Sequence, residues 1–127
     1  MFKSSGTLRY SQDPIKLVVN VDDNISNYYR SLIPKYIKIQ KPMYPAHISV
    51  VRKCIPRNMW NWAKYDGLEV SFQYENIIHY DELYFWLNVY SIELESIRTE
   101  LGLELWGGVS LSCGFNHMFH ITISNCK

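Results

Sequence analysis

The sequence predicts an α+β fold, with antiparallel sheets and helices in one compact domain over residues 1–127. The length suits a single hydrophobic core, and the 47% apolar composition is ordinary for a globular protein. Stretches typical of strands and helices follow one another in the order strand, helix, strand and then strands, helix, strand. Because each half of this order ends in a strand that carries a histidine, the sequence predicts two antiparallel sheets of related layout.

The first half of the chain contains one predicted helix, over residues 25–32. Asp22, Asp23 and Asn24 supply cap residues and first-turn acids before it, and Pro34 ends it. Apolar, β-branched runs on either side of this helix predict strands. The other elements predicted for this half are strands at 15–21, 36–39 and 46–53 and a short helix or turn at 56–65.

The second half is predicted to contain a longer, amphipathic helix. Between residues 90 and 103, Ile92, Leu94 and Ile97 recur at helical spacing among Glu and Arg, and Gly102 ends the pattern. The other elements predicted for this half are strands at 68–74, 83–89 and 119–124 and a loop at 106–118 that forms one wall of a cleft.

A repeated tripeptide lies inside two of the predicted strands: His47-Ile48-Ser49 and His120-Ile121-Thr122. Strand alternation puts each imidazole on the same face as its hydroxyl. If the two strands face each other, both pairs converge on one cleft, where one imidazole can act as base and the other as acid on a phosphodiester. The alternative is two strands with an exposed polar face, because four histidines among many Ser and Thr residues also produce this spacing by chance.

The charge distribution is uneven although the net charge is only +1. Residues 24–65 hold eight basic residues and no Asp or Glu, whereas the chain from Asp66 onward holds nine acidic residues against Arg98 and Lys127. The first tripeptide lies in the basic segment. This predicts a basic rim that attracts an anionic ligand; an ordinary solvated surface is the alternative.

Four residues are predicted to hold the substrate: Tyr10, Tyr84, Trp86 and Lys53. The apolar residues of the 83–89 strand should pack inward, which leaves Tyr84, Trp86 and Asn88 on the other face as a cleft floor. Tyr10 follows a glycine-containing segment and is a second candidate for base stacking. Lys53 supplies charge for phosphate. Core packing of Trp86 and a solvated surface role for Lys53 remain the alternatives.

The cysteines, two of the histidines and the hydropathy of the chain indicate its compartment and argue against some kinds of site. Three widely spaced cysteines fit neither a disulfide framework nor a zinc pattern, which favours a reducing cytoplasm. His117 and His120 would point to opposite faces of a strand, which argues against a metal site. No leader pattern and no apolar run of membrane-spanning length are present, so we expect no membrane association. No obligate protein partner is evident from the sequence.

On these residues the chain resembles the two-histidine (2H) phosphoesterase superfamily, which includes the 2′-5′ RNA ligase-like proteins and cyclic phosphodiesterases. That superfamily is defined by paired His-x-Thr/Ser-x motifs, and residues 47–50 and 120–123 match both. The strand and helix at 15–32 and those at 83–102 are similar to the elements that precede each motif in the family.

The resemblance implies a bilobed fold, in which two antiparallel sheets flank a central cleft with helices outside, and catalysis without a metal or other cofactor. It implies that His47 and His120 are the acid and base. Ser49 and Thr122 would donate hydrogen bonds to the phosphate oxygens. Ser49 departs from the commoner Thr but keeps the hydroxyl, and the chain ends soon after Thr122.

The small size and residues 6–10 are most similar to bacteriophage 2H enzymes that destroy the cyclic-oligonucleotide signals of bacterial CBASS immunity. The implied substrate is a cyclic di- or trinucleotide such as cyclic GMP–AMP. Attack by a ribose 2′-OH would cleave its 3′-5′ bond through a 2′,3′-cyclic phosphate. Two alternatives remain: a 2′,3′-cyclic phosphodiesterase that acts on RNA ends, and a module that sequesters nucleotides without turnover.

Overall fold

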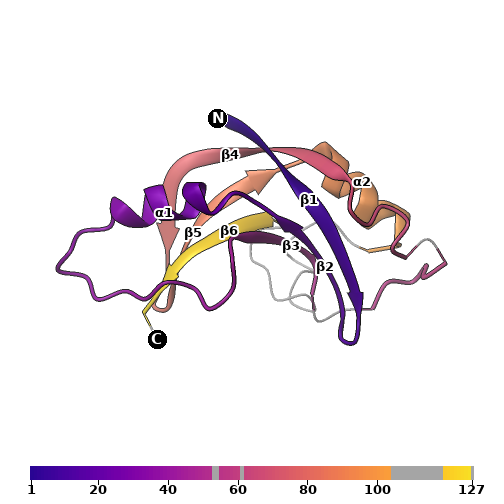
Figure 1. Cartoon of the computed structure of the whole chain (residues 1–127), viewed down its shortest axis with the longest axis horizontal. Coiled ribbons are helices and arrows are strands. Elements are labelled where there is room, and N and C mark those ends of the chain that lie inside the picture. The colour runs from indigo at the N-terminus through magenta and orange to yellow at the C-terminus, as the bar shows by residue number, and fades with distance from the viewer. Residues whose placement is uncertain (53–54, 61, 104–118, 127) are drawn as a thin grey trace.

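The strands of the computed structural model form one closed antiparallel barrel (Figure 1). The structure describes residues 1–52, 55–60, 62–103 and 119–126. The strand order around the barrel is β1-β2-β3-β6-β5-β4, and the pairing of β1 with β4 closes it. The elements are β1 (Phe2–Gln12), β2 (Ile15–Asn20), α1 (Asp23–Ser31), β3 (His47–Val51), β4 (Glu69–Tyr80), β5 (Tyr84–Tyr90), α2 (Ile92–Glu100) and β6 (Phe119–Asn125).

The predicted bilobed α+β architecture, with two antiparallel sheets flanking a central cleft and helices outside, is wrong. The molecule is predominantly β, and its strands make a single sheet because β3 pairs directly with β6 and β1 pairs directly with β4. These two pairings join segments far apart in the sequence, and local patterns carry no information about them. The same order of elements nevertheless occurs twice, as β1-β2-α1-β3 and as β4-β5-α2-β6.

Most individual elements are confirmed, with ends that differ by a few residues. The exception is residues 36–39, which form a turn and irregular backbone rather than a strand. Residues 56–65 were predicted as a short helix or turn, and the described residues of this range contain turns and no helix. Strand β1 is an addition, because its polar sequence lacks the apolar alternation of a typical strand. At Gly6 a side chain would lie 2.4 Å from the Asn20 carbonyl oxygen, so glycine permits the close approach of β1 to β2. The predicted loop at 106–118 lies outside the described residues.

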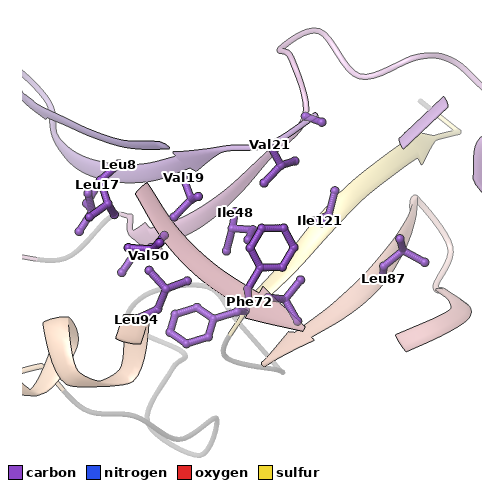
Figure 2. Close-up of a cluster of buried hydrophobic side chains, with 14 of the residues drawn as sticks. Leu8, Leu17, Val19, Val21, Ile48, Val50, Phe72, Leu87, Leu94 and Ile121 are labelled. Carbon is purple, nitrogen blue, oxygen red and sulfur yellow. The ribbon is translucent and has the colours of Figure 1, made fainter. Parts of the chain in front are cut away.

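The core lies inside the barrel, and all six strands contribute buried apolar side chains to it. Figure 2 shows side chains of several strands gathered in one cluster with Leu94 of α2. In Figure 1 the two helices lie at opposite ends of the set of strands. Each helix adds buried residues to the same core, including Tyr29 from α1 and Ile97 from α2.

Both helices begin at a side-chain cap. The Asp22 carboxylate accepts from the Asn24 backbone N–H at 2.9 Å, and the Ser91 hydroxyl accepts from the Leu94 N–H at 3.2 Å. Gly102 follows α2 with a φ of +76°, which suits the predicted end of that helix. In the described ranges, no helix has the length and apolar character needed to cross a membrane.

Candidate functional site

The two histidine motifs lie side by side on the outer face of the barrel. Ile48 of β3 pairs with Ile121 of β6, and both are fully buried in the core. Because this pair is antiparallel, the flanking residues lie opposite each other on the outer face: His47 beside Thr122, and Ser49 beside His120. We call these four half-buried residues the motif surface.

The spacing on the motif surface follows from the antiparallel pairing of β3 with β6. Residues directly opposite in an antiparallel pair have Cβ atoms about 5 Å apart, and diagonal neighbours are about 7–8 Å apart. His47 and His120 are such diagonal neighbours, and each lies beside the hydroxyl of the other motif. The predicted convergence of the two pairs therefore arises between adjacent strands of one sheet rather than across a cleft.

Each motif strand contains a bulge directly after its hydroxyl residue. The register of β2 with β3 shifts so that Val50 is the extra residue, between Ser49 and Val51. The register of β5 with β6 shifts in the same way at Ile123, between Thr122 and Ser124. In both strands the bulged residue and the one after it are fully buried, so the polar outer face ends at the hydroxyl.

His47 presents a defined nitrogen to a ligand. Its Nδ1 lies 2.8 Å from the Pro45 carbonyl oxygen, which can only accept, so Nδ1 carries the proton and donates it. In the neutral ring this leaves Nε2 as the nitrogen without a proton. The hydrogen bond to the Pro45 carbonyl fixes the orientation of the His47 ring, as a hydrogen bond to the other ring nitrogen commonly does for catalytic imidazoles.

His120 lies beside a polar and aromatic network on β5 and β4. Asn88 is its partner in the register, and the Trp86 ring meets the His120 ring edge-on at 6.4 Å between centroids. The Trp86 indole N–H donates to Asn88 Oδ1 at 3.0 Å, so the Asn88 amide nitrogen faces His79 and donates to its Nε2 at 3.1 Å. The rings of His79 and Trp86 stack at 6.0 Å.

The residues predicted to bind substrate are brought together only in part. Tyr84 and Trp86 face outward on β5, as the alternation predicted, and Trp86 is the register partner of Thr122. Tyr10 faces the core side of β1, where its ring meets Trp62 edge-on at 4.9 Å. Burial, with Tyr65 and nearby carboxylates, raises the pKa of Tyr10 to about 12. Lys53 lies outside the described residues.

Part of the basic segment lies at the end of the motif strands. The backbone of Gln40 pairs with that of Asn125, with N···O distances of 2.8 and 3.1 Å. Asn125 follows Thr122 by three residues, and Thr122 is opposite His47. The exposed side chains of Lys38 and Lys41 therefore extend from the backbone next to this end of the motif surface.

A concavity of about 850 Å³ lies between β1, β4 and the start of α2, away from the motif surface. Ser4, Glu69, Ser71 and Glu93 are among its lining residues, and none of the seven predicted site residues that the structure describes lines it. In the part of the chain that the structure describes, no three His, Cys, Asp or Glu side chains are grouped to hold a metal ion. The motif surface is the place where the two histidines of the repeated motif and their hydroxyl neighbours lie together.

His79 was not among the predicted site residues, whereas Asn88 was placed on the predicted cleft floor with Tyr84 and Trp86. His79 lacks a hydroxyl neighbour, and the strand predicted at 68–74 ended before reaching it. The signal that could have found it is the β-branched and aromatic sequence around it, Ile77, Ile78 and Tyr80, which continues the strand. Comparison of the chain with protein-family models, curated proteins and solved structures gives no match.

Proposed function

We propose that the protein is a phosphodiesterase of the two-histidine type, which uses His47 and His120 as a paired acid and base. The observation that supports this most is the Ile48–Ile121 pairing, since it gives each imidazole a hydroxyl neighbour from the other motif. Chance repetition of a tripeptide would not require the two copies to be adjacent and in matching register. Nor would it require the bulge that follows each copy.

The reaction proposed is internal attack on a 3′-5′ phosphodiester next to a free ribose 2′-OH. One imidazole removes the 2′-OH proton, the 2′-oxygen bonds to phosphorus, and the bond to the 5′-oxygen breaks as the other imidazole protonates that oxygen. Ser49 and Thr122 donate to the non-bridging oxygens as their charge grows. Water can then open the 2′,3′-cyclic phosphate, with the two imidazoles exchanging roles.

The substrate class proposed is a cyclic di- or trinucleotide, such as the cyclic GMP–AMP of bacterial CBASS immunity. Trp86 and Tyr84 offer aromatic side chains beside the motif surface on which a base can stack. The exposed Lys38 and Lys41 supply positive charge near His47, which favours an anionic ligand. The family resemblance supports the cyclic form of the substrate.

A panel of substrates tests this proposal. The purified chain is incubated with cyclic GMP–AMP, a cyclic trinucleotide and a short RNA that ends in a 2′,3′-cyclic phosphate, with and without EDTA. We expect cleavage of a cyclic oligonucleotide through a 2′,3′-cyclic phosphate, unchanged by EDTA. A 2′-O-methyl analogue should bind and resist cleavage.

Each other outcome of the panel is informative. Opening of the RNA end alone would replace the cyclic substrate with an RNA-processing role. Tight binding of nucleotides without turnover would indicate sequestration. Neither binding nor cleavage of any member, or rapid cleavage of the 2′-O-methyl analogue, would overturn the proposed reaction.

A further inference from the structure

Two arginines from the helices contact the bulges that follow the histidine motifs. Arg98 of α2 donates from Nη1 to the Val50 carbonyl oxygen of β3 at 2.5 Å. Arg30 of α1 donates from Nη1 to the Ile123 carbonyl oxygen of β6 at 2.9 Å. The contacts cross between the halves of the chain, since the helix of each half binds the motif strand of the other.

We propose that Arg30 and Arg98 are positioning residues that fix Ser49 and Thr122 at the bulges, which makes each motif depend on the helix of the opposite half. This inference rests on the proposed function for its catalytic consequence, but not for its structural one. Both carbonyls belong to the residue directly after the motif hydroxyl. Each arginine therefore acts one peptide away from a group that would contact phosphate.

The bulges explain why these carbonyls need such a partner. An extra residue in one strand disrupts the ladder locally and leaves backbone groups without their regular strand partner. Val50 and Ile123 are fully buried, where a backbone carbonyl without a hydrogen bond is costly. A guanidinium supplies a charge-assisted bond and a rigid planar geometry that a neutral donor does not.

The burial and the hydrogen bonds of the two arginines indicate that each side chain is held in one position. Arg98 is itself 3% exposed, and a charged side chain is seldom buried to this degree without a partner. Arg30 also donates to the hydroxyl of Ser26 at 3.2 Å and to the side chain of Asn27. Both side chains lie in the last turn of their helices, so movement of either helix would be transmitted to the opposite motif strand.

The test compares Arg30→Gln and Arg98→Gln with the matched variants Arg30→Lys and Arg98→Lys. Lys3→Gln, at the exposed start of strand β1, serves as the control for loss of a positive charge. Side-chain and backbone NMR resonances of both motifs are recorded for each folded variant, which requires no activity. With a substrate that the wild type cleaves, kcat and KM are measured separately.

We expect a crosswise result. Arg98→Gln should shift resonances of Ser49 and Val50 more than those of Thr122 and Ile123, and Arg30→Gln should do the reverse. The value of kcat should fall about 10- to 100-fold with little change in KM, because a displaced hydroxyl donates a weaker hydrogen bond to the phosphate oxygens in the transition state. The Lys variants should recover part of the loss, and Lys3→Gln should match the wild type.

The outcomes separate this inference from the proposed function. If the wild type cleaves nothing in the panel, the NMR pattern alone decides, and a crosswise pattern supports the positioning role. Equal shifts at both motifs, or shifts confined to the half that carries the substitution, would overturn it. If Arg98→Gln does not fold, Arg30→Gln is the decisive variant, because Arg30 is only half-buried. Unchanged resonances of β6 in Arg30→Gln would refute the inference.

Discussion

The two motif strands, β3 and β6, share one plan but differ in what surrounds their histidines. Both carry a histidine and a hydroxyl on the outer face, then a bulge, then a carbonyl bound by an arginine of the other half. His47 is oriented by a backbone carbonyl, at Pro45, and lies in the segment without acidic residues. His120 lies beside the aromatic ring of Trp86.

This difference suggests a division of labour between the two halves. The shared plan supplies matched acid–base and hydroxyl groups, which a reaction with exchanged proton roles requires. The unequal surroundings suit an unequal substrate, with phosphate charge attracted at the His47 side and a base stacked at the His120 side. Equal chemistry and unequal binding are therefore the expected behaviour of the two halves.

The largest effects should come from the histidines. His47→Ala and His120→Ala should each lower kcat by about 10²–10⁴-fold, because each removes one partner of the acid–base pair. Steady-state kinetics on the wild-type substrate measure this, with circular dichroism to verify folding. A loss at only one of the two positions would break the proposed equality of the halves.

The hydroxyls should follow with smaller but equal losses. Ser49→Ala and Thr122→Val each remove one donor to the phosphate oxygens, which should lower kcat by about 10²–10³-fold. Ser49→Thr, which keeps the hydroxyl, is the matched control and should retain most activity. If either hydroxyl variant turned over at the wild-type rate, that hydroxyl would have no part in the reaction.

Substrate affinity should depend on the Trp86 ring beside His120. Trp86→Ala should raise Kd for the substrate by about 10- to 100-fold, since a stacked base contributes roughly 1–3 kcal/mol. Titration calorimetry measures it, and Tyr28→Ala, an exposed aromatic on α1, is the control. Unchanged affinity in Trp86→Ala would remove the proposed stacking position.

Substitutions of the helix caps should have the smallest effects. Their effect on the free energy of unfolding should differ between the two halves. Asp22→Ala and Ser91→Ala should each lower the free energy of unfolding by about 1 kcal/mol. Ser91 should cost more, because it is buried and its hydroxyl also donates to the Ser71 carbonyl at 2.8 Å. Urea denaturation measures both; a larger loss for Asp22→Ala would contradict this order.

Local sequence patterns predicted the elements better than their assembly. Alternation identified β5, apolar β-branched runs identified the motif strands, cap residues identified the start of α1, and helical spacing identified α2, because these patterns depend on near neighbours. The pairing of β3 with β6 and of β1 with β4 depends on residues distant in sequence, so the barrel was missed. The bulges at Val50 and Ile123 were missed for the same reason, since register exists only between strands.

The site shows the same limit. The tripeptides could be found from spacing alone, and their adjacency depended on the register. Tyr10 was predicted to bind substrate from its isolation in the sequence, yet its ring lies toward Trp62 on the core side. Arg30 and Arg98 look like ordinary last-turn cations in the sequence. Their contacts with the opposite motif strands arise only when the two halves are joined.

The central claim is that His47 and His120 form one acid–base unit, and a double-mutant cycle tests it most directly. The rate of 2′,3′-cyclic phosphate formation is measured for the wild type, His47→Ala, His120→Ala and the double variant. Groups that act as a unit are non-additive, so the double variant should cleave about as slowly as the slower single variant. Losses that multiply in the double variant, or a double variant as fast as the wild type, would contradict the claim.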